Sequence, residues 1–159
     1  MSDIAILAPI PHEHLISGIK VTETSGFVAF GSRKWEMFRA LDDVRGKQPV
    51  PVLIYPSHTS GSSPMPVKCS WLGWYIGHVE SPNGKHPHGE THRPVSAESD
   101  TIGHWAVFWH IAQLERLPSE EEVKIQDLQT IKGGWRKNSP PRGPELIAAP
   151  TGLIYPVSL

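Results

Sequence analysis

Residues 32–80 decide the fold of this chain. The stretch starts with SRKWEMFRALDDVRG at residues 32–46, continues with VPVLIYPSH at 50–58 and ends with WLGWYIGHVE at 71–80. The first segment has the spacing of an amphipathic helix, the second is almost wholly apolar, and the third is rich in tryptophan. We therefore expect a helix followed by two strands.

The helix is predicted from apolar residues that recur every three positions and so share a face: Trp35, Phe38, Leu41 and Val44. Ser32 is the expected N-cap, and Gly46 marks the expected end. Basic residues remain on the other sides of this helix, namely Arg33, Lys34 and Arg39. A basic surface beside a buried apolar face is the predicted arrangement.

The two strands are predicted from their hydrophobic runs. Residues 50–55 are too apolar for a strand with one wet face, which favours a buried strand, and its end at residues 56–58 is expected to be exposed. Residues 60–66 are rich in Gly, Ser and Pro and are expected to form a loop. The second strand carries Leu72, Trp74, Ile76 and Val79, with a bulge expected at Gly73 or Gly77. A polar strand end and a tryptophan cluster would then lie close together.

This order of segments resembles EVE domains of the PUA-like superfamily. In that family an Arg-led helix precedes a strand ending in Tyr-His-Ser and then a glycine-containing strand. The matching positions are Arg33, Glu36, Leu41, Tyr55, Ser57, Gly77 and Val79. Residues 105–133 resemble the closing strand of the family, a Leu-Pro turn and a short helix carrying Leu128 and Ile131. The resemblance spans residues 27–132, but the strand end reads Tyr-Pro-Ser-His here, and Lys34 and Glu36 replace typical Asn and Gln residues.

The resemblance implies one α+β domain over residues 1–159, a small twisted mixed β-barrel with two or three short helices. It also implies a nucleic-acid binding module, for DNA or RNA, that holds an extruded and modified base in an aromatic pocket. The residues expected to form that pocket are Trp35, Tyr55, Ser57, His58, Trp71, Trp74 and Trp105. The residues expected to bind phosphates are Arg33, Lys34, Arg39, Arg136, Lys137 and Arg142.

A second relative of the same superfamily competes at the N-terminus. The segment LISGIKVTE resembles the ASCH-domain signature, with matches at Gly18, Lys20 and Glu23. The alternative function is an ASCH-like hydrolase of a modified nucleoside, such as an acylated cytidine, or of RNA. Its catalytic residues would be Lys20, Thr22 or Thr24, and Glu23. The structural alternative is that Gly18 ends a short helix begun near Pro11 and that residues 21–24 start a strand.

Composition limits the remaining classes. A net charge of −1 argues against a protein that coats nucleic acid by bulk electrostatics, so any nucleic-acid contact needs a local patch. The 14 Gly and 16 Pro residues favour short strands and many turns. Cys69 is the single cysteine, which excludes an internal disulfide and favours a packing role. We expect no membrane span and a cytoplasmic location; a protein-interaction module with a protein partner is the third function considered.

Two loops carry the remaining signals. Residues 81–101 are expected to form a long loop, in which His86, His88, Glu90 and His92 alternate as weak candidates for a metal; we expect no native metal and no cofactor. Residues 133–145 are expected to form a basic loop around Trp135, which either follows phosphates or is only a surface loop. Residues 143–159 contain two short apolar runs broken by Pro150 and Pro156, and they are expected to add an edge strand or a packed tail.

Overall fold

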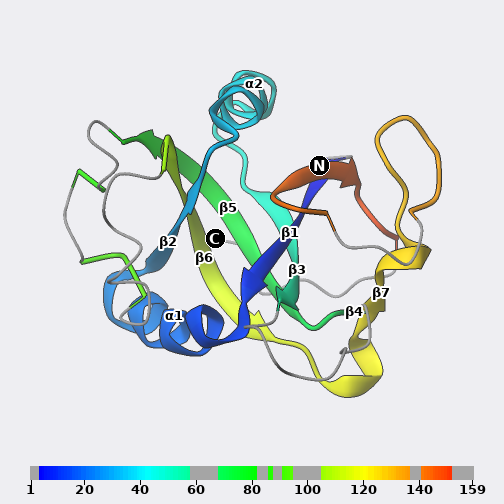
Figure 1. The fold of residues 1–159 in the computed structure, drawn as a ribbon, viewed down its shortest axis with the longest axis horizontal. Helices are drawn as coiled ribbons and strands as arrows, with labels where there is room; N and C mark the ends of the chain where they lie inside the picture. Colours follow the sequence, from blue (N-terminus) through cyan, green and yellow to red (C-terminus); the bar gives the residue numbers. More distant parts are fainter. Residues whose placement is uncertain are drawn as a thin grey trace.

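A mixed six-stranded sheet with strand order β2-β6-β5-β3-β1-β8 organises the chain (Figure 1). The computed structural model describes residues 4–57, 68–81, 86–87, 91–94, 105–136 and 141–151. In chain order the elements are β1 (Ile4–Pro11), α1 (His12–Ser25), β2 (Phe27–Ser32), α2 (Trp35–Arg45), β3 (Val50–Ser57), β4 (Lys68–Cys69), β5 (Trp71–Glu80), β6 (Val107–Arg116), the 3₁₀ turn η3 (Ser119–Glu121), β7 (Val123–Lys124), the 3₁₀ turn η4 (Ile125–Asp127) and β8 (Glu145–Ala148). The predicted α+β class is confirmed.

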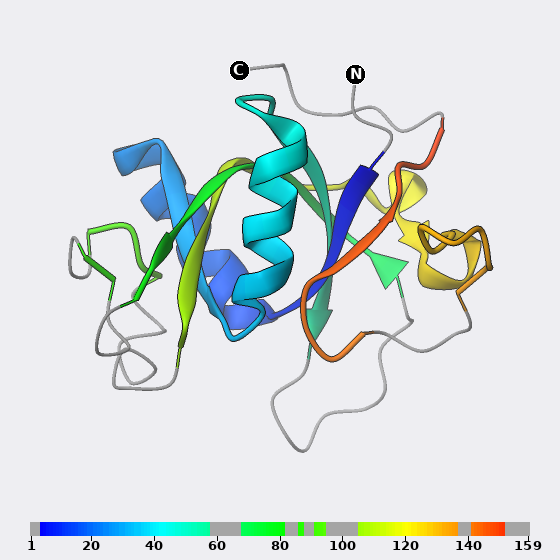
Figure 2. The same ribbon diagram turned by 90° about the horizontal axis from the view of Figure 1, so that it is seen from above.

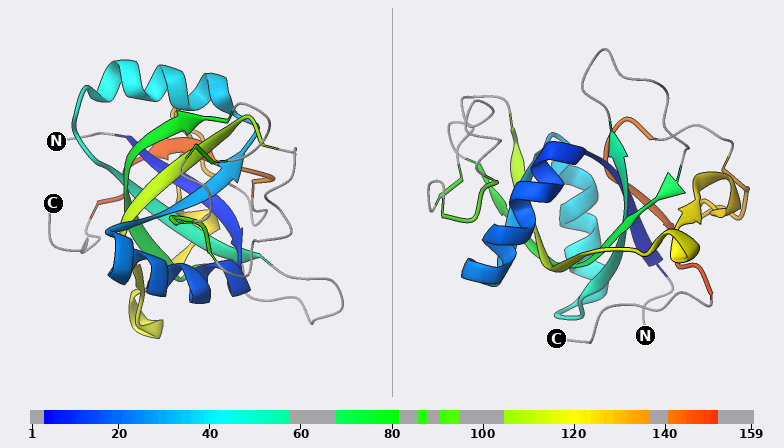
Figure 3. Two further views of the ribbon diagram at one scale, coloured as in Figure 1. Left: turned by 90° about the vertical axis from the view of Figure 1, so that its left-hand side faces the viewer. Right: turned by 90° about the horizontal axis from the view of Figure 1, so that it is seen from below.

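The sheet curves around one main core. Alternate residues of the strands point into it, as Ile6 and Ala8 of β1 and Val52 and Ile54 of β3 do. Both helices contribute to this same core, α1 through Leu15 and α2 through two buried residues, so they close it from opposite sides (Figures 1 and 3). A smaller cluster on the other face of β1 and β3 packs under β4, β7 and η4.

The strand pairing explains the curvature. β1 runs parallel to β3, while β3–β5, β5–β6, β2–β6 and β1–β8 are antiparallel. The β5–β6 ladder shifts register between Leu72 and Trp74, which flank Gly73, and again between Tyr75 and Gly77, so irregularities lie at or beside both glycines where a bulge at one of them was expected. Bulges increase strand twist and bend, so β5 and β6 can wrap around the core. Among the described residues no ladder joins the edge strands β2 and β8, and closure into a barrel stays a prediction.

The helix and strands predicted from residues 32–80 are present, with two differences. α2 ends at Gly46 as expected, but it begins at Trp35, and the Ser32 hydroxyl accepts a hydrogen bond from the Lys34 N–H at 3.1 Å one step before the helix. Phe38 and Leu41 are buried, whereas Trp35 and Val44 are 43% and 72% exposed. A strict three-residue spacing drifts around a helix of 3.6 residues per turn, so the ends of the apolar row leave the core.

The N-terminal third differs most from expectation. Residues 4–11 form β1, a strand that the sequence analysis did not predict. The expected helix end at Gly18 and strand at 21–24 are wrong, because α1 continues to Ser25 and is capped by left-handed Gly26, whose N–H donates to Thr22 O at 2.9 Å. Gly18 is buried, and a Cβ there would touch Leu114 and Val28 at 3.4 Å. Its small size serves close packing of the helix on the sheet.

The C-terminal half contains short elements. β6 confirms the predicted closing strand, but residues 119–121 and 125–127 form 3₁₀ turns instead of one helix. Leu128 is buried, while Ile131 lies in an exposed turn. β8 is an edge strand of the main sheet beside β1 (Figure 2). For the C-terminal segment an edge strand or a packed tail was expected, and the edge strand is confirmed.

Candidate functional site

A pocket of about 350 Å³ lies where β1 and β2 end and α2 begins. Its walls come from four parts of the chain: the end of β1 with the start of α1, residues 30–34, Arg93 with Trp105 and Trp109, and residues 142–144. The volume is near the lower end of the range of about 300–1,000 Å³ that is typical of small-ligand pockets. Segments distant in sequence therefore meet around one concave site.

The floor of the pocket is apolar and buried. Ile10, Phe30 and Trp109 line it and are 4%, 5% and 1% exposed. The rings of Phe30 and Trp109 lie 6.1 Å apart at 52°, a tilted aromatic pair. Trp105 is half-buried and forms a further aromatic wall. Such a surface suits a planar, apolar group.

The mouth of the pocket is cationic. Arg33, Lys34 and Arg142 are exposed lining residues, and Arg93 lines the pocket while only 5% exposed. No Asp or Glu occurs among the described residues that line it. The Lys34 ammonium donates to Pro144 O at 2.7 Å, which ties residues 141–144 to the start of α2. Four positive charges around one cavity favour an anion at its mouth.

Gly31 makes room for the aromatic wall of the pocket, and Gly143 lies beside Lys34 at its mouth. A Cβ built on Gly31 would overlap the indole ring of Trp105, so only glycine lets this ring lie directly on β2. The backbone N–H of Ala106 donates to Ser32 O at 3.0 Å and fixes the chain beside the tryptophan. A Cβ at Gly143 would contact the Lys34 side chain at 3.5 Å, an ordinary van der Waals distance. The position of Trp105 is thus set by β2 itself.

The helix α2 adds a weaker electrostatic contribution. Its eleven residues begin at Trp35, directly after the pocket residues Arg33 and Lys34. The partial positive charge of a helix N-terminus favours a nearby anion. A helix terminus carries only about half an elementary charge, whereas each Lys or Arg carries a full one, so the side-chain cations dominate the field at the mouth.

The structure brings together only part of the predicted nucleobase set. Trp105 lines the pocket, but Trp71 is wholly buried in the main core and Tyr55 lies in the smaller cluster. Trp35 lies on the exposed side of α2, 5.6 Å below the Arg39 guanidinium in a cation–π contact, and Trp74 is half-buried on β5. None of these four other aromatic residues lines the pocket.

The polar strand end also lies apart from the pocket. Ser57 is half-buried at the end of β3, Pro56 is buried where exposure was expected, and neither lines the pocket. The expectation for His58 falls outside the described residues. Tyr55 and Leu53 face the smaller cluster because β3 is covered on both faces, so the strand end is not next to Trp105.

The predicted phosphate-binding residues divide in the same way. Arg33, Lys34 and Arg142 meet at the mouth of the pocket. Arg39 instead pairs with Glu80 at 3.6 Å on the exposed side of α2, and Arg136 donates to both carboxylate oxygens of Glu145 at 2.7 Å. Lys137 lies outside the described residues.

The residues of the alternative catalytic set lie on the second half of α1. Thr22 Oγ1 donates to Gly18 O and Thr24 Oγ1 donates to Lys20 O, each at 2.9 Å, so both hydroxyls bond within the helix. Lys20 and Glu23 are exposed. None of these residues lines the pocket.

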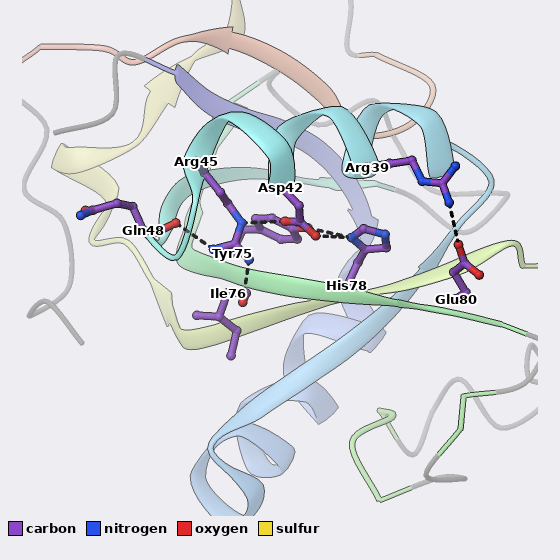
Figure 4. A network of polar contacts seen from close by, with 8 residues as sticks. All are labelled: Arg39, Asp42, Arg45, Gln48, Tyr75, Ile76, His78 and Glu80. Carbon is purple, nitrogen blue, oxygen red and sulfur yellow. Dashed lines mark hydrogen bonds and ion pairs between the residues drawn. The ribbon is translucent and has the colours of Figure 1, made fainter.

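A second polar constellation joins α2 to β5 (Figure 4). Asp42 accepts hydrogen bonds from Arg45 Nε at 2.6 Å and from the Tyr75 hydroxyl at 2.8 Å, and its other oxygen lies 2.6 Å from His78 Nδ1. Arg45 also donates to Ile76 O at 3.1 Å. No described pocket residue belongs to this network, so we assign it a structural role.

The network shifts the pKa values of two of its members. Burial by itself would raise the pKa of Asp42, but the hydrogen bonds from Arg45 and Tyr75 outweigh burial and hold that pKa below its ordinary value. Burial, reinforced by the Asp42 carboxylate, raises the pKa of the Tyr75 hydroxyl far above its ordinary value. Asp42 is therefore charged and Tyr75 neutral at pH 7.

The described histidines of residues 81–101, His86 and His92, contact the sheet. The Nε2 atoms of His86 and His110 lie 3.0 Å apart, and the His92 ring stacks on Phe27 with centroids 4.0 Å apart. Within the described ranges, no three His, Cys, Asp or Glu side chains are grouped so that they could hold a metal ion. His88 and Glu90 lie outside the part of the chain that the structure describes.

Several pocket residues were missed by the sequence analysis. His14, Phe30 and Arg93 were not predicted for the site, yet all three line it. Arg93 directly follows His92 in a segment that was expected to be a loop, so its sequence neighbours gave no sign that it would be buried in a pocket. His14 lies in the first turn of α1, and its place beside the pocket follows from β1, the strand that was not predicted. An apolar run at residues 4–8 was the available signal for that strand.

Of the helices in the described part of the chain, none combines the length and the apolar character needed to cross a membrane.

A scan of the chain against models of known protein families gives no match, and a search among curated proteins gives none either. The assignment of a function therefore rests on the residues of the pocket.

Proposed function

We propose that this protein binds nucleic acid and accommodates one extruded base in the pocket beside α2. The observation that carries the proposal is the union of a buried aromatic floor with a cationic mouth: Trp105 and Trp109 meet Arg33 and Arg142 around one cavity. A base is planar and stacks on aromatic rings, while its phosphates are anions that stay near solvent. The aromatic floor of the pocket suits the base of a nucleotide, and its cationic mouth suits the phosphates.

The mouth favours a nucleotide that belongs to a polymer. Arg33 and Arg142 are exposed, so they can reach phosphates that flank the extruded nucleotide. The structure gives Arg142 no hydrogen bond or ion pair with other described residues, which leaves its guanidinium available for a phosphate. A net charge of −1 means that binding depends on this local patch and not on the charge of the whole protein.

The wider resemblance agrees with this proposal. We propose a PUA-like domain of the EVE type, in which the curved sheet is a partly open form of a small barrel and the two helices close its ends. A modified base is the proposed occupant, because a snug pocket can distinguish added groups by their fit. Arg93, Ser32 and His14 are the polar lining groups suited to hydrogen-bond its edge.

The test is binding of purified protein to fluorescent oligonucleotides of matched sequence. The panel holds single-stranded DNA and RNA, a matched duplex, and duplexes with one mismatched, methylated, hydroxymethylated or acetylated cytosine. Extrusion costs less for an unpaired base, so single strands and mismatched duplexes are expected to bind more tightly than the matched duplex. Equal affinity for all duplexes, or binding of free mononucleotides alone, would reject the extruded-base mechanism.

Variants locate the binding in this pocket. Trp105→Leu is expected to weaken binding by about tenfold or more, because stacking of a base on an aromatic ring contributes about 1–3 kcal/mol. Trp35→Leu is the matched control, since this exposed tryptophan does not line the pocket. If Trp35→Leu weakens binding and Trp105→Leu does not, the site is on the outer side of α2 instead.

The hydrolase alternative is separated in the same samples. Oligonucleotide masses are measured after incubation with wild type and with Lys20→Ala. A mass change that depends on Lys20 would make the protein an enzyme and would move the active site to α1, where Lys20 lies. Absence of both binding and mass change across the panel would favour the protein-interaction module.

A further inference from the structure

A short strap, residues 141–144, lines one side of the pocket. It has the sequence Pro-Arg-Gly-Pro and leads directly into β8. Both prolines are buried, Arg142 is exposed, and residues 142–144 line the pocket. A proline ring fixes φ, so the two prolines restrict the backbone at both ends of the strap. The strap therefore presents one side chain, that of Arg142, to the mouth of the pocket.

Lys34 holds this strap from the other edge of the sheet. β2 and β8 are the two edge strands, Lys34 follows β2 by two residues, and Pro144 stands directly before β8. The Lys34 ammonium donates to Pro144 O at 2.7 Å, and the strap lies beside the start of α2 (Figure 2). A hydrogen bond from a charged donor is stronger than one between neutral groups. This contact therefore links the ends of the two edge strands at the pocket.

The backbone and the side chain of Lys34 are themselves held in place. Its N–H donates to the Ser32 hydroxyl at 3.1 Å, and its C=O accepts a hydrogen bond from the Phe38 N–H at 3.3 Å in the first turn of α2. A Cβ at Gly143 would lie 3.5 Å from Lys34 Cε, so the lysine side chain lies along the strap. The hold on Pro144 thus starts from a fixed part of the chain.

Lys34 and Arg142 differ in what their charged groups contact. The Lys34 ammonium is bound to a backbone carbonyl of the strap, whereas the Arg142 guanidinium has no hydrogen bond or ion pair with the described residues. A guanidinium is planar and can give a phosphate two parallel N–H bonds, which an ammonium cannot. Arg142 is therefore the better phosphate ligand, and Lys34 determines where the strap that carries it lies.

We propose that Lys34 is a positioning residue: it holds Pro144 and so keeps Arg142 at the mouth, where Arg142 contacts the phosphate. The proposal rests on the proposed function, because the phosphate is that of the bound nucleic acid. It differs from the expectation, drawn from the sequence, that Lys34 itself binds phosphate. Loss of the Lys34 ammonium would then have the same effect on binding as loss of the Arg142 guanidinium.

The first experiment measures the affinity for a fluorescent single-stranded oligonucleotide at several salt concentrations. The variants are Lys34→Met, Arg142→Gln and the double variant. Each single variant is expected to bind about tenfold more weakly and to lose about one phosphate contact from the salt dependence. Because both residues act through one contact, the double variant is expected to match Arg142→Gln within about twofold. Two independent phosphate contacts would instead add up to a loss of about a hundredfold.

A second measurement, without nucleic acid, reports on the strap itself. Trypsin cuts after Arg142 only while this part of the chain is locally open, so the initial rate of that cut follows how often the strap opens. The cut is expected to be several times faster in Lys34→Met, while the cut after Lys20 on α1 keeps its wild-type rate. Lys34→Arg retains the charge and the donors and should keep the slow cut after Arg142. Lys124→Met, which removes an exposed lysine outside the pocket, is the matched control and should change neither rate.

The possible results separate this proposal from the proposed function. Faster cleavage after Arg142 in Lys34→Met, with no binding of the oligonucleotide even by wild type, would support the hold of Lys34 on the strap and overturn the nucleic-acid function. Affinity losses that add in the double variant, or an unchanged rate of cleavage after Arg142, would overturn the positioning role. Faster cleavage after both Arg142 and Lys20 would overturn it as well, because Lys34 would then stabilise the fold as a whole.

Discussion

At the scale of single residues, the contact of Trp105 with Gly31 defines the aromatic wall of the pocket. The indole ring occupies the space that any larger residue at position 31 would need. A glycine in a strand commonly marks a close approach of another group, and here that group is the wall on which the base is proposed to stack. The shape of the pocket thus depends on Gly31 having no side chain.

Gly31→Ala is therefore expected to displace the Trp105 indole and to weaken oligonucleotide binding by about tenfold, in line with the loss of one stacking contact. Crowding of this kind is also expected to lower the free energy of unfolding by about 1–3 kcal/mol. Binding titrations and urea unfolding measure the two effects. Gly134→Ala is the control, because a Cβ there would lie 3.7 Å from the nearest side-chain atom, Thr130 Oγ1. Wild-type binding by Gly31→Ala would show that Trp105 does not stack on the ligand.

The single thiol shows a different consequence of burial. Cys69 is wholly buried beside β7, and burial raises its pKa to about 12. Because the thiolate is the reactive form, we expect native protein to react with a thiol-specific disulfide reagent only as fast as it opens, and unfolded protein to react at once. The absorbance of the released thiol measures both rates. Rapid reaction of the native protein at pH 8 would contradict this burial.

At the scale of elements, the contacts of Asp42 attach the C-terminal half of α2 to β5. Tyr75, His78 and Arg45 all approach the same carboxylate (Figure 4). Arg45 lies 5.0 Å above the Tyr75 ring as well. A helix of eleven residues gains most of its stability from tertiary contacts of this kind.

Asp42→Asn is expected to lower the free energy of unfolding at pH 7 by about 1–3 kcal/mol, because the charge-assisted bonds are lost. The folded-state pKa of Asp42 lies below the model-compound value of 3.8, so its stabilisation is present above that value and is lost as the pH falls through the folded-state pKa. The difference between wild type and variant should therefore shrink below pH 4 in urea unfolding series. Asp43→Asn is the matched control on the exposed side of α2, and an equal loss there would contradict the role of the network.

At the scale of the whole molecule, four cationic side chains line one pocket although the net charge is −1. Arg33, Lys34 and Arg142 come from two segments more than a hundred residues apart in the chain and meet because β8 returns beside β1 (Figure 2). The proposed function therefore predicts that a polyanion binds in one orientation and not along the whole surface.

The dependence of binding on salt tests this local charge. We expect the logarithm of the affinity to fall linearly with the logarithm of the salt concentration, and Arg142→Gln to reduce that slope by about one phosphate contact. Fluorescence titrations at several salt concentrations give the slope. Lys124→Gln removes an exposed charge that does not line the pocket and should leave the slope unchanged. An unchanged slope in Arg142→Gln would exclude this residue from the contact.

The elements whose pattern is local were predictable from the order of the residues. The helix at residues 35–45, the buried strand after it, an irregularity beside a glycine of β5 and the edge strand near residue 145 follow from periodicity and from turn residues, which act over a few positions. Three of the basic residues at the mouth of the pocket were also predicted, because they stand in basic segments.

Which of these residues line the pocket depends on how the distant parts of the chain pack together. Six tryptophans look alike in sequence, yet Trp71 is sealed in the core while Trp105 is half-buried at the pocket, because different segments cover them. β1 gains its place from pairing with β3 more than forty residues later, and Arg93 gains its place from the edge of β2. Long-range pairing and burial depend on the whole chain, and no local pattern contains them.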